Sequence, residues 1–400
     1  MLIVKKFGGS SVADAEKITR VAGIIADSYR EGHDVVVVLS AQGDTTDDLI
    51  AKAEEINPKG SKREMDVLLS AGEQISIALM AIALEKLGLP VVSLTGWQVK
   101  ITTDTSHGMA RIKEVDVERL RRELDSRRIV LVAGFQGVTS YGDITTLGRG
   151  GSDTTAVAVA AALHASLCQI YTDVEGVYTA DPRKIPDAKK LQEITYDDML
   201  ELASLGAQVL HNRSVEMAKR YSVNLEVLSS YVRAPGTKVK EVVKQVEQMK
   251  ISGVAKDTNV ARIALVGLPD EPGVAFRVFQ VLAKAKINVD IILQSMGREG
   301  TNDISFTVTK SDMEPACEAL KEQQAGIKFE RIDVDENVAK ISIVGSGMLN
   351  SPGIAAMMFE ALANAEINIK MISTSEIKVS VLIDGDMADT AVTSIHSRFF

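Results

Sequence analysis

Residues 2–11 read LIVKKFGGSS, an apolar run that leads through two lysines into paired glycines and serines. The run predicts a buried strand at residues 2–5, and residues 13–30 after it carry apolar side chains at helical spacing. A glycine turn between a strand and a helix lets backbone N–H groups approach a phosphate, and the helix start adds its positive end. In the alternative interpretation the glycines serve only the geometry of a tight turn. From this turn alone, both interpretations stay open.

The alternation of strand and helix continues to about residue 230. Further strands are predicted at residues 35–39, 91–94, 129–133, 168–172 and 223–228. The strand at 35–39, VVVVL, is apolar throughout, as expected of a parallel strand that is covered on both faces. Helical patterns such as residues 65–87 separate the strands. This order predicts an α/β fold, a three-layer α-β-α sandwich around a mainly parallel sheet.

Composition narrows the class of protein. The 400 residues predict two or three domains, and 46% hydrophobic with 25% charged residues is typical of a globular protein. A net charge of −9 and only 4% aromatic residues disfavour nucleic acid as a partner. Cys168 and Cys317 lie far apart, and we expect two buried thiols in a reducing compartment. The start resembles no signal peptide and no apolar run suggests a membrane span, so a cytoplasmic location is expected.

An internal repeat follows, at a fixed offset of 80 residues. Residues 272–292 are identical at ten of 21 positions to residues 352–372, beginning with the same Pro-Gly pair. Each repeat predicts strand, Pro-Gly turn, helix, strand, strand and helix. The first repeat adds a strand at 329–334, whereas the second ends in its helix. We therefore expect residues 251–256 to supply the last strand of the second repeat, because an unpaired edge leaves backbone groups without partners.

The predicted boundaries follow from this repeat. The first domain covers residues 1–233, and a linker with a charged amphipathic helix at 238–250 covers 234–250. The first repeat, residues 257–335, would be inserted into the second, which comprises residues 251–256 and 336–400.

A second glycine-rich loop, TLGRGGSDTT at residues 146–155, precedes a predicted helix at 154–165. Its Arg149 offers a bidentate fork for a carboxylate or phosphate, and Asp153 could orient a lysine or a metal ion. The structural alternative is a helix start capped by Ser152 or Asp153, and both readings can hold together. Two glycine loops before helices in one domain make phosphate binding the better interpretation.

Three further stretches are candidates for ligand binding. The polar loop at residues 40–46 follows strand 35–39, where ligands gather in open α/β sheets, although it could be only a capped turn. Glu73 stands among apolar residues, where a carboxylate needs a partner, either a substrate ammonium or a structural cation. The turn-rich loop at 171–183 could close over a nucleotide. The five histidines form no recognisable metal set.

These segments together resemble the aspartate kinases of the amino-acid-kinase superfamily, of the monofunctional bacterial type. The similarity covers essentially the whole chain, and the repeats resemble paired ferredoxin-like βαββαβ ACT domains. The resemblance implies transfer of the γ-phosphoryl group of ATP, with Mg²⁺, to the β-carboxylate of L-aspartate, giving 4-phospho-L-aspartate. It implies catalytic roles for Lys6 and Asp153. No protein side chain is expected to bind the metal ion directly, because Mg²⁺ would arrive with ATP.

The resemblance also implies three sets of binding residues. Phosphate oxygens would contact Lys6, Phe7, Gly8, Gly9 and Ser10. Aspartate would contact Ser40, Thr45, Thr46, Glu73, Arg149, Gly150, Gly151 and Ser152, with Glu73 receiving its ammonium. The nucleotide would contact Thr172, Asp173, Tyr178, Asp181 and Arg183.

For the repeats, the resemblance implies feedback inhibition in lysine, threonine and methionine biosynthesis, by lysine, threonine or both. The effector would contact Asp270, Gly273, Val274, Ala275, Asn288 and Gln294 of the first repeat, and Ile354, Ala355 and Asn368 of the second. A homo-oligomer through the ACT domains is expected, as is a shorter regulatory subunit that begins near Met249. Two alternatives stand beside this interpretation: a non-catalytic amino-acid sensor, and a kinase for another acidic amino acid.

Overall fold

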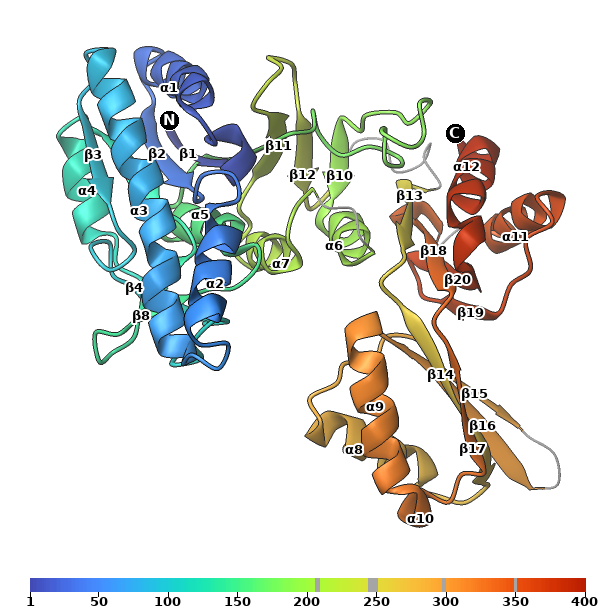
Figure 1. Cartoon of the computed structure of the whole chain (residues 1–400). Coiled ribbons are helices and arrows are strands. Elements are labelled where there is room, and N and C mark those ends of the chain that lie inside the picture. Colours follow the sequence, from blue (N-terminus) through green and yellow to red (C-terminus); the bar gives the residue numbers. More distant parts are fainter. Residues whose placement is uncertain (206–208, 244–250, 297–299, 349–350) are drawn as a thin grey trace. The chain divides into compact units, whose positions relative to one another are not determined.

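The computed structural model describes residues 1–205, 209–243, 251–296, 300–348 and 351–400. Its contacts divide the chain into two compact units. The first comprises Met1–Tyr178, Lys190–Ser204 and Gln208–Lys244, and the second comprises Thr179–Lys189, Leu205–Ala207 and Gln245–Phe400. Figure 1 shows the chain in sequence colours.

The first unit is built on an eight-stranded sheet with the order β10-β12-β11-β9-β1-β2-β6-β3. Its strands are β1 (Leu2–Phe7), β2 (Asp34–Leu39), β3 (Val91–Leu94), β6 (Ile129–Ala133), β9 (Leu167–Thr172), β10 (Glu193–Thr195), β11 (Leu225–Ser229) and β12 (Thr237–Lys240). All neighbours run parallel except β11 and β12. A smaller sheet contains β4 (Ile101–Thr103), β5 (Ile112–Val115), β7 (Gln136–Val138) and β8 (Ile144–Thr146).

Helices cover both faces of the large sheet. They are α1 (Ala15–Arg30), α2 (Thr45–Ile56), α3 (Lys62–Lys86), α4 (Glu118–Asp125), α5 (Gly151–Leu163), α6 (Tyr196–Ser204) and α7 (Asn212–Arg220). Successive side chains of a strand point to opposite faces, and β1 shows the consequence. Phe7 lies in the apolar core with α1 and α3, whereas Lys6 faces α5. The predicted three-layer α/β sandwich is confirmed.

The amphipathic helix expected at 238–250 is wrong where the structure describes it. Residues Thr237–Lys240 form strand β12, which pairs with β10 and β11. Val239 is fully buried between exposed or half-buried lysines, a period-two pattern that suits a strand. Residues 244–250 lie outside the described part of the chain. The sheet of the first unit therefore extends into the predicted linker.

The second unit contains two four-stranded antiparallel sheets, each with helices. One repeat consists of β14 (Ala261–Pro269), α8 (Val274–Lys284), β15 (Ile292–Met296), β16 (Thr301–Val308), α9 (Lys310–Glu322), α10 (Gln324–Ile327) and β17 (Arg331–Asp335). The other consists of β13 (Gly253–Asp257), β18 (Val338–Val344), α11 (Ile354–Asn364), β19 (Met371–Thr374), β20 (Lys378–Asp384) and α12 (Ala388–Phe399). Strand β13 pairs antiparallel with β18, as β17 pairs with β14.

The segment Thr179–Lys189 leaves the first unit and packs in the second, unlike the predicted boundary at residue 233. Ala180 and Ile185 are buried in the same apolar core as β18 and α12. The hydroxyl of Thr179 lies 2.8 Å from Nε2 of His396. The loop that follows β9 is thus shared by both units.

Candidate functional site

A cavity of about 270 Å³ lies in the first unit, at the carboxyl ends of β1 and β2. Both glycine loops and the loop after β2 supply its lining. The residues are Lys6, Gly8, Gly9, Ser40, Ala41, Gly43, Thr46, Glu73, Phe135, Gly148, Arg149, Gly150, Gly151, Ser152 and Asp153. Eleven of them are residues that the sequence analysis selected for catalysis, phosphate binding or substrate binding. The structure thus brings together side chains up to about 150 positions apart in the chain.

Lys6 and Asp153 form an ion pair across the cavity wall, with Nζ of Lys6 2.6 Å from Oδ1 of Asp153. Each side chain is 12% exposed, so water screens the pair only weakly. The contact lacks the alignment of a hydrogen bond, because Oδ1 of Asp153 has no hydrogen-bond partner. Distance and burial therefore define it as an ion pair that fixes the ammonium of Lys6 beside the glycine loop.

The first glycine loop is shaped by its neighbours as well as by any ligand. A Cβ atom on Gly9 would lie 2.6 Å from the carbonyl oxygen of Ala41, a contact that requires the backbone to move. Gly43 also donates its N–H to the carbonyl of Gly9 over 3.1 Å. Packing against Ala41 and Gly43 accounts for Gly9, and the phosphate-binding interpretation of the turn stays a prediction. Gly9 is needed for packing, while Gly8 leaves the space above Lys6 Nζ open, 3.6 Å from where its Cβ would be.

The second glycine loop enters α5 through left-handed backbone conformations. Gly148 has φ +76° and Gly150 has φ +69°, and Gly150 is the N-cap of the helix. The expectation that Ser152 or Asp153 caps the helix is wrong, because both lie in its first turn. A Cβ on Gly150 would lie 2.2 Å from the ring of His211. Glycine is therefore required at this position both by the left-handed backbone and by the close approach of the ring.

Glu73 on α3 is a buried carboxyl group in the wall of the cavity. Its side chain is buried, and Oε1 accepts a hydrogen bond from the N–H of Ala41 over 3.2 Å. Oε2 is buried and has no hydrogen-bond partner among the residues that the structure describes. Burial raises the pKa of this carboxyl to about 8, against a weaker opposing effect of backbone hydrogen bonds. A carboxylate in this position lacks a cation, and a ligand ammonium in the cavity would supply one.

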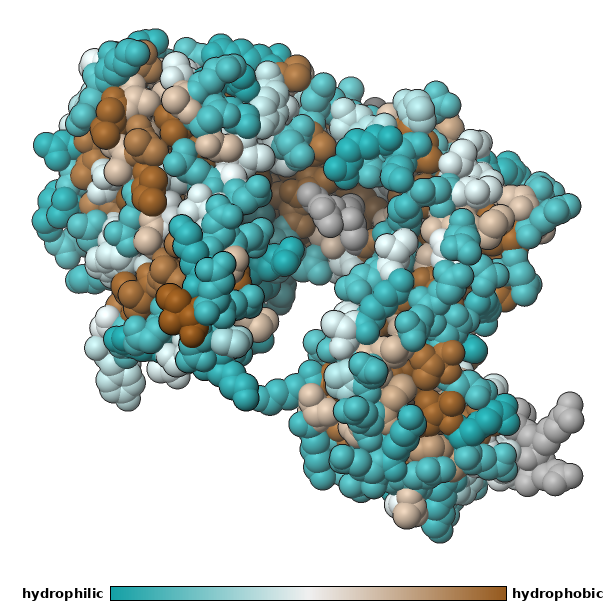
Figure 2. All heavy atoms as spheres, viewed as in Figure 1, coloured by the Kyte–Doolittle hydropathy of each residue, from teal (hydrophilic) through white to brown (hydrophobic). Residues whose placement is uncertain are grey.

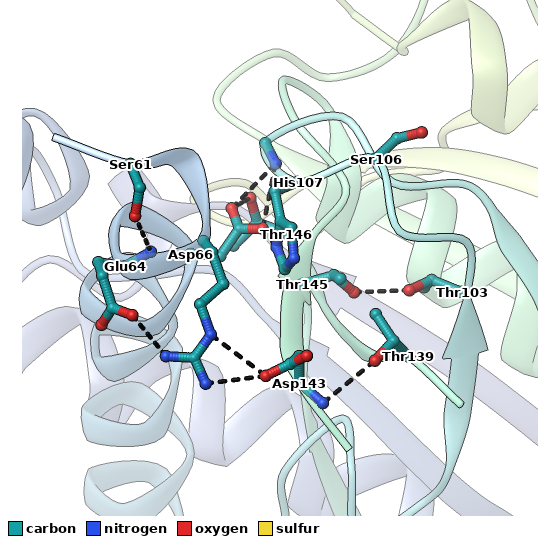
Figure 3. Close-up of polar contacts among 12 residues, drawn as sticks. Ser61, Glu64, Asp66, Thr103, Ser106, His107, Thr139, Asp143, Thr145 and Thr146 are labelled. Carbon is teal, nitrogen blue, oxygen red and sulfur yellow. Dashed lines mark hydrogen bonds and ion pairs between the residues drawn. The ribbon is translucent and has the colours of Figure 1, made fainter. Parts of the chain in front are cut away.

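A second buried carboxylate, Asp66, lies seven residues before Glu73 on α3. The sequence analysis did not select it. It accepts hydrogen bonds from the Thr146 hydroxyl at 2.6 Å and from the Gly108 N–H at 3.0 Å, and it pairs with Nδ1 of His107 at 2.8 Å. Figure 3 shows Thr146 and His107 converging on Asp66 from two chain segments. Thr146 ends β8 and is the first residue of the second glycine loop, so Asp66 holds the start of that loop.

Arg213 on α7 holds the same loop from the other side, and sequence reasoning missed it too. Its guanidinium donates to the carbonyl of Leu147 at 2.5 Å and to that of Ala110 at 2.9 Å. A lone arginine in a helix gives no signal in sequence that it reaches a distant backbone. Together, Asp66 and Arg213 fix Thr146 and Leu147, the two residues that lead into the turn that presents Arg149.

Several predicted residues do not line the cavity. Phe7 is fully buried and stacks on Tyr171 with ring centroids 4.4 Å apart, which makes it a core side chain. Ser10 is exposed, and its carbonyl accepts from the hydroxyl of Tyr231. Thr45 starts α2 beside Gly72, with its methyl group 3.6 Å from the position a Cβ of that glycine would take.

The predicted nucleotide residues fall in both units. Thr172 and Asp173 end β9 and follow it, with a 2.9 Å hydrogen bond between their side chains, and Tyr178 belongs to the same unit. Asp181 and Arg183 belong to the second unit, where they form an ion pair at 3.0 Å. The structure therefore divides this set, because the loop that carries it passes from one unit to the other.

The predicted effector residues cluster by repeat in the second unit. Asp270 accepts from Asn302 over 2.8 Å beside Gly273, which starts α8 at φ +93°. Val274 is buried, Ala275 is half-buried, and Asn288 and Gln294 are exposed. In the other repeat, Gly353 takes the same conformation, φ +91°, before Ile354 and Ala355 of α11, and Asn368 is exposed.

Known proteins match both units. Residues 1–229 match the amino acid kinase family, and residues 263–324 and 341–399 match ACT domains. An aspartokinase of Mycolicibacterium smegmatis is 50% identical over 403 residues, covering 100% of this chain and 96% of the relative. An aspartokinase of Geobacillus stearothermophilus is 50% identical over 398 residues, covering 100% of this chain and 97% of the relative.

Among solved structures, E. coli aspartokinase III in complex with aspartate and ADP aligns with a TM-score of 0.85 at 29% identity. The alignment covers 100% of both chains. The same E. coli protein with lysine and aspartate aligns with a TM-score of 0.79 at 28% identity, covering 100% of this chain and 99% of that one.

Proposed function

The chain belongs to the aspartokinases of the amino acid kinase family, and we propose that the cavity of its first unit is where ATP phosphorylates L-aspartate. The reaction transfers the γ-phosphoryl group to the β-carboxylate and gives 4-phospho-L-aspartate and ADP. The unpartnered, buried Oε2 of Glu73 is the observation that supports this best. An amino-acid substrate brings the ammonium that this oxygen lacks, and its carboxylates match the cations of Lys6 and Arg149.

Each polar group of the cavity then has a defined task. Glu73 binds the substrate ammonium, and Arg149 clamps a substrate carboxylate with its fork of N–H donors. The ammonium of Lys6, oriented by Asp153 at 2.6 Å, stabilises the charge on the phosphoryl oxygens during transfer. Thr46, Ser40 and Ser152 supply hydroxyls near the substrate. The attacking carboxylate is already an anion, so no general base is needed and catalysis consists of positioning and charge neutralisation.

The nucleotide set is Thr172, Asp173, Tyr178, Asp181 and Arg183, with backbone donors from Gly8, Gly9 and Ser10 for its phosphates. Use of ATP is consistent with the ADP held by the E. coli relative. For Mg²⁺, the acidic residues of the cavity are few: Asp153 is paired with Lys6, and Glu73 is committed to the ammonium. This donor set fits an ion that is held mainly by ATP oxygens, where it would neutralise phosphate charge. Asp153 would be the acidic side chain available to orient such an ion.

Regulation is assigned to the second unit. We infer that lysine, bound by the E. coli relative, is also an effector of this chain, and that threonine is a second candidate. The effector would contact Asp270, Gly273, Val274, Ala275, Asn288, Gln294, Ile354, Ala355 and Asn368. The proposed domains are residues 1–233, the linker 234–250, the inserted repeat 257–335, and the repeat formed by 251–256 and 336–400.

The remaining assignments concern assembly and location. We infer a cytoplasmic enzyme that forms a homo-oligomer through its ACT domains. A shorter regulatory subunit starting near Met249 is part of the same proposal, although Met249 lies outside the described residues. The alternatives, a sensor without activity and a kinase for another acidic amino acid, predict no acyl phosphate with aspartate or a faster reaction with glutamate.

A hydroxamate assay separates these outcomes. Hydroxylamine traps an acyl phosphate as a coloured iron–hydroxamate complex, so product formation from ATP, Mg²⁺ and aspartate measures the proposed reaction directly. We expect product with aspartate and at least about a hundredfold lower kcat/KM with glutamate, whose extra methylene misplaces the carboxylate relative to Glu73. Equal rates with both substrates would contradict the assignment.

A further inference from the structure

A second cavity of the first unit lies on the opposite face of the large sheet from the proposed catalytic cavity. Lys5 and Lys6 are successive residues of β1, so their side chains point to opposite faces. Lys6 lines the catalytic cavity, whereas Lys5 lines a cavity of about 290 Å³ between α1, β9 and the hairpin of β11 and β12. Among the described residues, the two linings have none in common. A ligand beside Lys5 would therefore be separate from the reactants that Lys6 contacts.

Lys5 is a buried cation that has no counter-ion among the described residues. The residue is 2% exposed, and its Nζ donates to two neutral groups, the amide oxygen of Gln169 at 2.6 Å and the hydroxyl of Tyr171 at 3.1 Å. Burial lowers the pKa of this ammonium to about 8, against weaker opposing effects of nearby carboxylates, the largest from Glu226. At neutral pH the group is still mostly charged, and a buried charge is costly unless it is paired. An ammonium has three N–H donors, so one is left for a ligand.

The register of the sheet keeps Glu226 from pairing with Lys5 directly. Gln169 lies beside Lys5 in the pairing of β1 with β9, and Glu226 lies beside Gln169 in the pairing of β9 with β11. Two strand spacings therefore separate Lys5 from Glu226, about 10 Å between their backbones. The amide of Gln169 bridges this gap, since it accepts from Lys5 and donates to Oε2 of Glu226 over 2.8 Å. Neutral groups thus fix the position of the ammonium and leave its charge for an anion from outside the chain.

The rest of the lining suits an anion with a single charge and a short apolar body. Asp27 and Arg233 form an ion pair at 2.8 Å, and their side chains are 45% and 74% exposed, so they lie towards the opening. The charged lining residues together leave one net positive charge, that of Lys5. Much of the wall is apolar and is formed by Ile24, Leu228, Val232, Ala234 and Pro235.

The size and the surroundings of the cavity point to the same class of ligand. Figure 2 shows mainly hydrophilic or intermediate surface where Figure 1 places the hairpin of β11 and β12. The volume is at the small end of the range for ligand pockets. A second or third charge on the ligand would lack a partner beside the apolar wall, which disfavours polyphosphates and dicarboxylates.

We propose that this cavity is a binding site for a small monocarboxylate, which pairs with the ammonium of Lys5 and packs its apolar body between α1 and the hairpin of β11 and β12. The carboxylate takes the free donor of Lys5, and the guanidinium of Arg233 attracts it at the opening. Because β1 carries Lys5 and Lys6 at successive positions, an occupied site would also hold the strand that positions Lys6.

The test is a titration of the full-length protein with trifluorobutyrate, a monocarboxylate with a short apolar chain, followed by its fluorine NMR signal. We expect saturable binding to the wild type and at least about tenfold weaker binding to Lys5→Met, which keeps a long side chain but removes the charge. Lys6→Met is the matched control, because it removes the neighbouring cation from the opposite face of the sheet, and it should bind the probe like the wild type.

Three results would overturn the proposal. They are no saturable binding to the wild type, equal affinity of Lys5→Met and the wild type, and a loss of binding in Lys6→Met, which would place the probe in the catalytic cavity.

A second variant keeps the test decisive if Lys5→Met fails to fold. Gln169→Glu puts a carboxylate where the amide oxygen now accepts from Lys5, so the chain itself pairs the ammonium. We expect this variant to bind the probe at least about tenfold more weakly, although Lys5 is still present. Arg233→Gln should weaken binding only about two- to threefold, because an exposed charge contributes little. Wild-type affinity in a folded Gln169→Glu protein, as judged by its melting curve, would contradict the pairing with Lys5.

Discussion

Lys6 Nζ lies 2.6 Å from Asp153 Oδ1, and this ion pair joins the two glycine loops of the cavity. Lys6 is the penultimate residue of β1, two positions before Gly8, while Asp153 lies in the first turn of α5 after Gly150 and Gly151. The pair therefore sets the position of the ammonium relative to both loops before any ligand binds. A preorganised cation of this kind stabilises transferring charge without reorganising at the moment of reaction.

Replacing Lys6 by alanine should lower kcat at least about a hundredfold, or roughly 2.7 kcal/mol of transition-state stabilisation. The substitution removes the cation that faces the transferring phosphoryl group. Steady-state hydroxamate kinetics give kcat and both KM values. Lys17→Ala is the control, because Lys17 is a partly exposed residue of α1 outside the cavity lining, and it should leave kcat unchanged. A loss confined to the KM for aspartate would contradict the role given to Lys6.

The pH profile should reveal Glu73. Burial raises its pKa to about 8 in the free enzyme, and only the ionised form attracts an ammonium. We expect kcat/KM for aspartate to rise up to tenfold per pH unit between about pH 6 and 8, and then to level. Glu73→Gln should raise the KM for aspartate and abolish this rise. A Gln variant with the wild-type pH profile would show that another group titrates.

The raised pKa of Glu73 also predicts that the folded protein becomes less stable as the pH rises. The folded-state pKa of Glu73 is about 8 against an ordinary value of 4.5, so the native state holds a proton that the unfolded chain releases. Stability from this group is complete below about pH 4.5 and is lost as the pH rises towards 8. Glu73→Gln should therefore raise the Tm relative to the wild type at pH 8 and much less at pH 5. Thermal melts at both pH values measure it, and a lower Tm at pH 8 would mean that Glu73 stabilises the fold.

Residue types and periods in the sequence were sufficient for six of the eight strands of the large sheet, for the layers and for most of the cavity lining. Alternation along β1 and the apolar run of β2 are local signals, and so are the two glycine loops. Long-range contacts carry no such signal. Asp66 reads as one acidic residue in a helix start, and its bonds to Thr146 and His107 depend on how β8 and a distant loop fold onto α3. The strand Thr237–Lys240 was mistaken for a helix because its one buried valine, Val239, stands between two lysines, and so short an alternation gives little sign of a strand.

Asp66 provides a test of positioning. Asp66→Asn keeps the volume but puts an amide where Gly108 N–H, His107 or the Thr146 hydroxyl needs an acceptor, at a cost of about 1–3 kcal/mol. We expect the loop that carries Arg149 to shift, so that the KM for aspartate rises about tenfold or more while the KM for ATP changes little.

The matched control for that variant is Asp143→Asn, whose ion-pair partner Arg63 on α3 is 48% exposed. It should leave both KM values unchanged. If Asp66→Asn lowers only the Tm, with unaltered kinetics at low temperature, Asp66 is structural and does not position the loop.

The regulatory assignment predicts a separation of inhibition from catalysis. Gln294→Ala and Asn288→Ala should each raise the lysine concentration for half-inhibition about tenfold, with kcat unchanged, because exposed polar contacts to an effector are lost. Titrations of activity with lysine and threonine, singly and together, measure this. Asn368→Ala probes the other repeat in the same way. Inhibition that survives all three substitutions would place the effector elsewhere.

Point variants are preferable to deleting the second unit. Thr179–Lys189 contributes Ala180 and Ile185 to the core of that unit, so a deletion from about residue 250 would expose them. Loss of inhibition in a truncated chain would then be accompanied by lost stability, and the two effects could not be separated.

The central claim is that the Glu73 cavity receives an amino acid whose carboxylate is phosphorylated. Hydroxamate formation with ATP, Mg²⁺ and aspartate, compared between the wild type and Glu73→Gln at pH 8, tests it most directly. We expect ready product with the wild type and at least about a hundredfold lower kcat/KM for aspartate with the variant, whose melting temperature should be no lower. No product from the wild-type protein at saturating substrates, or equal kcat/KM values for the two proteins, would contradict it.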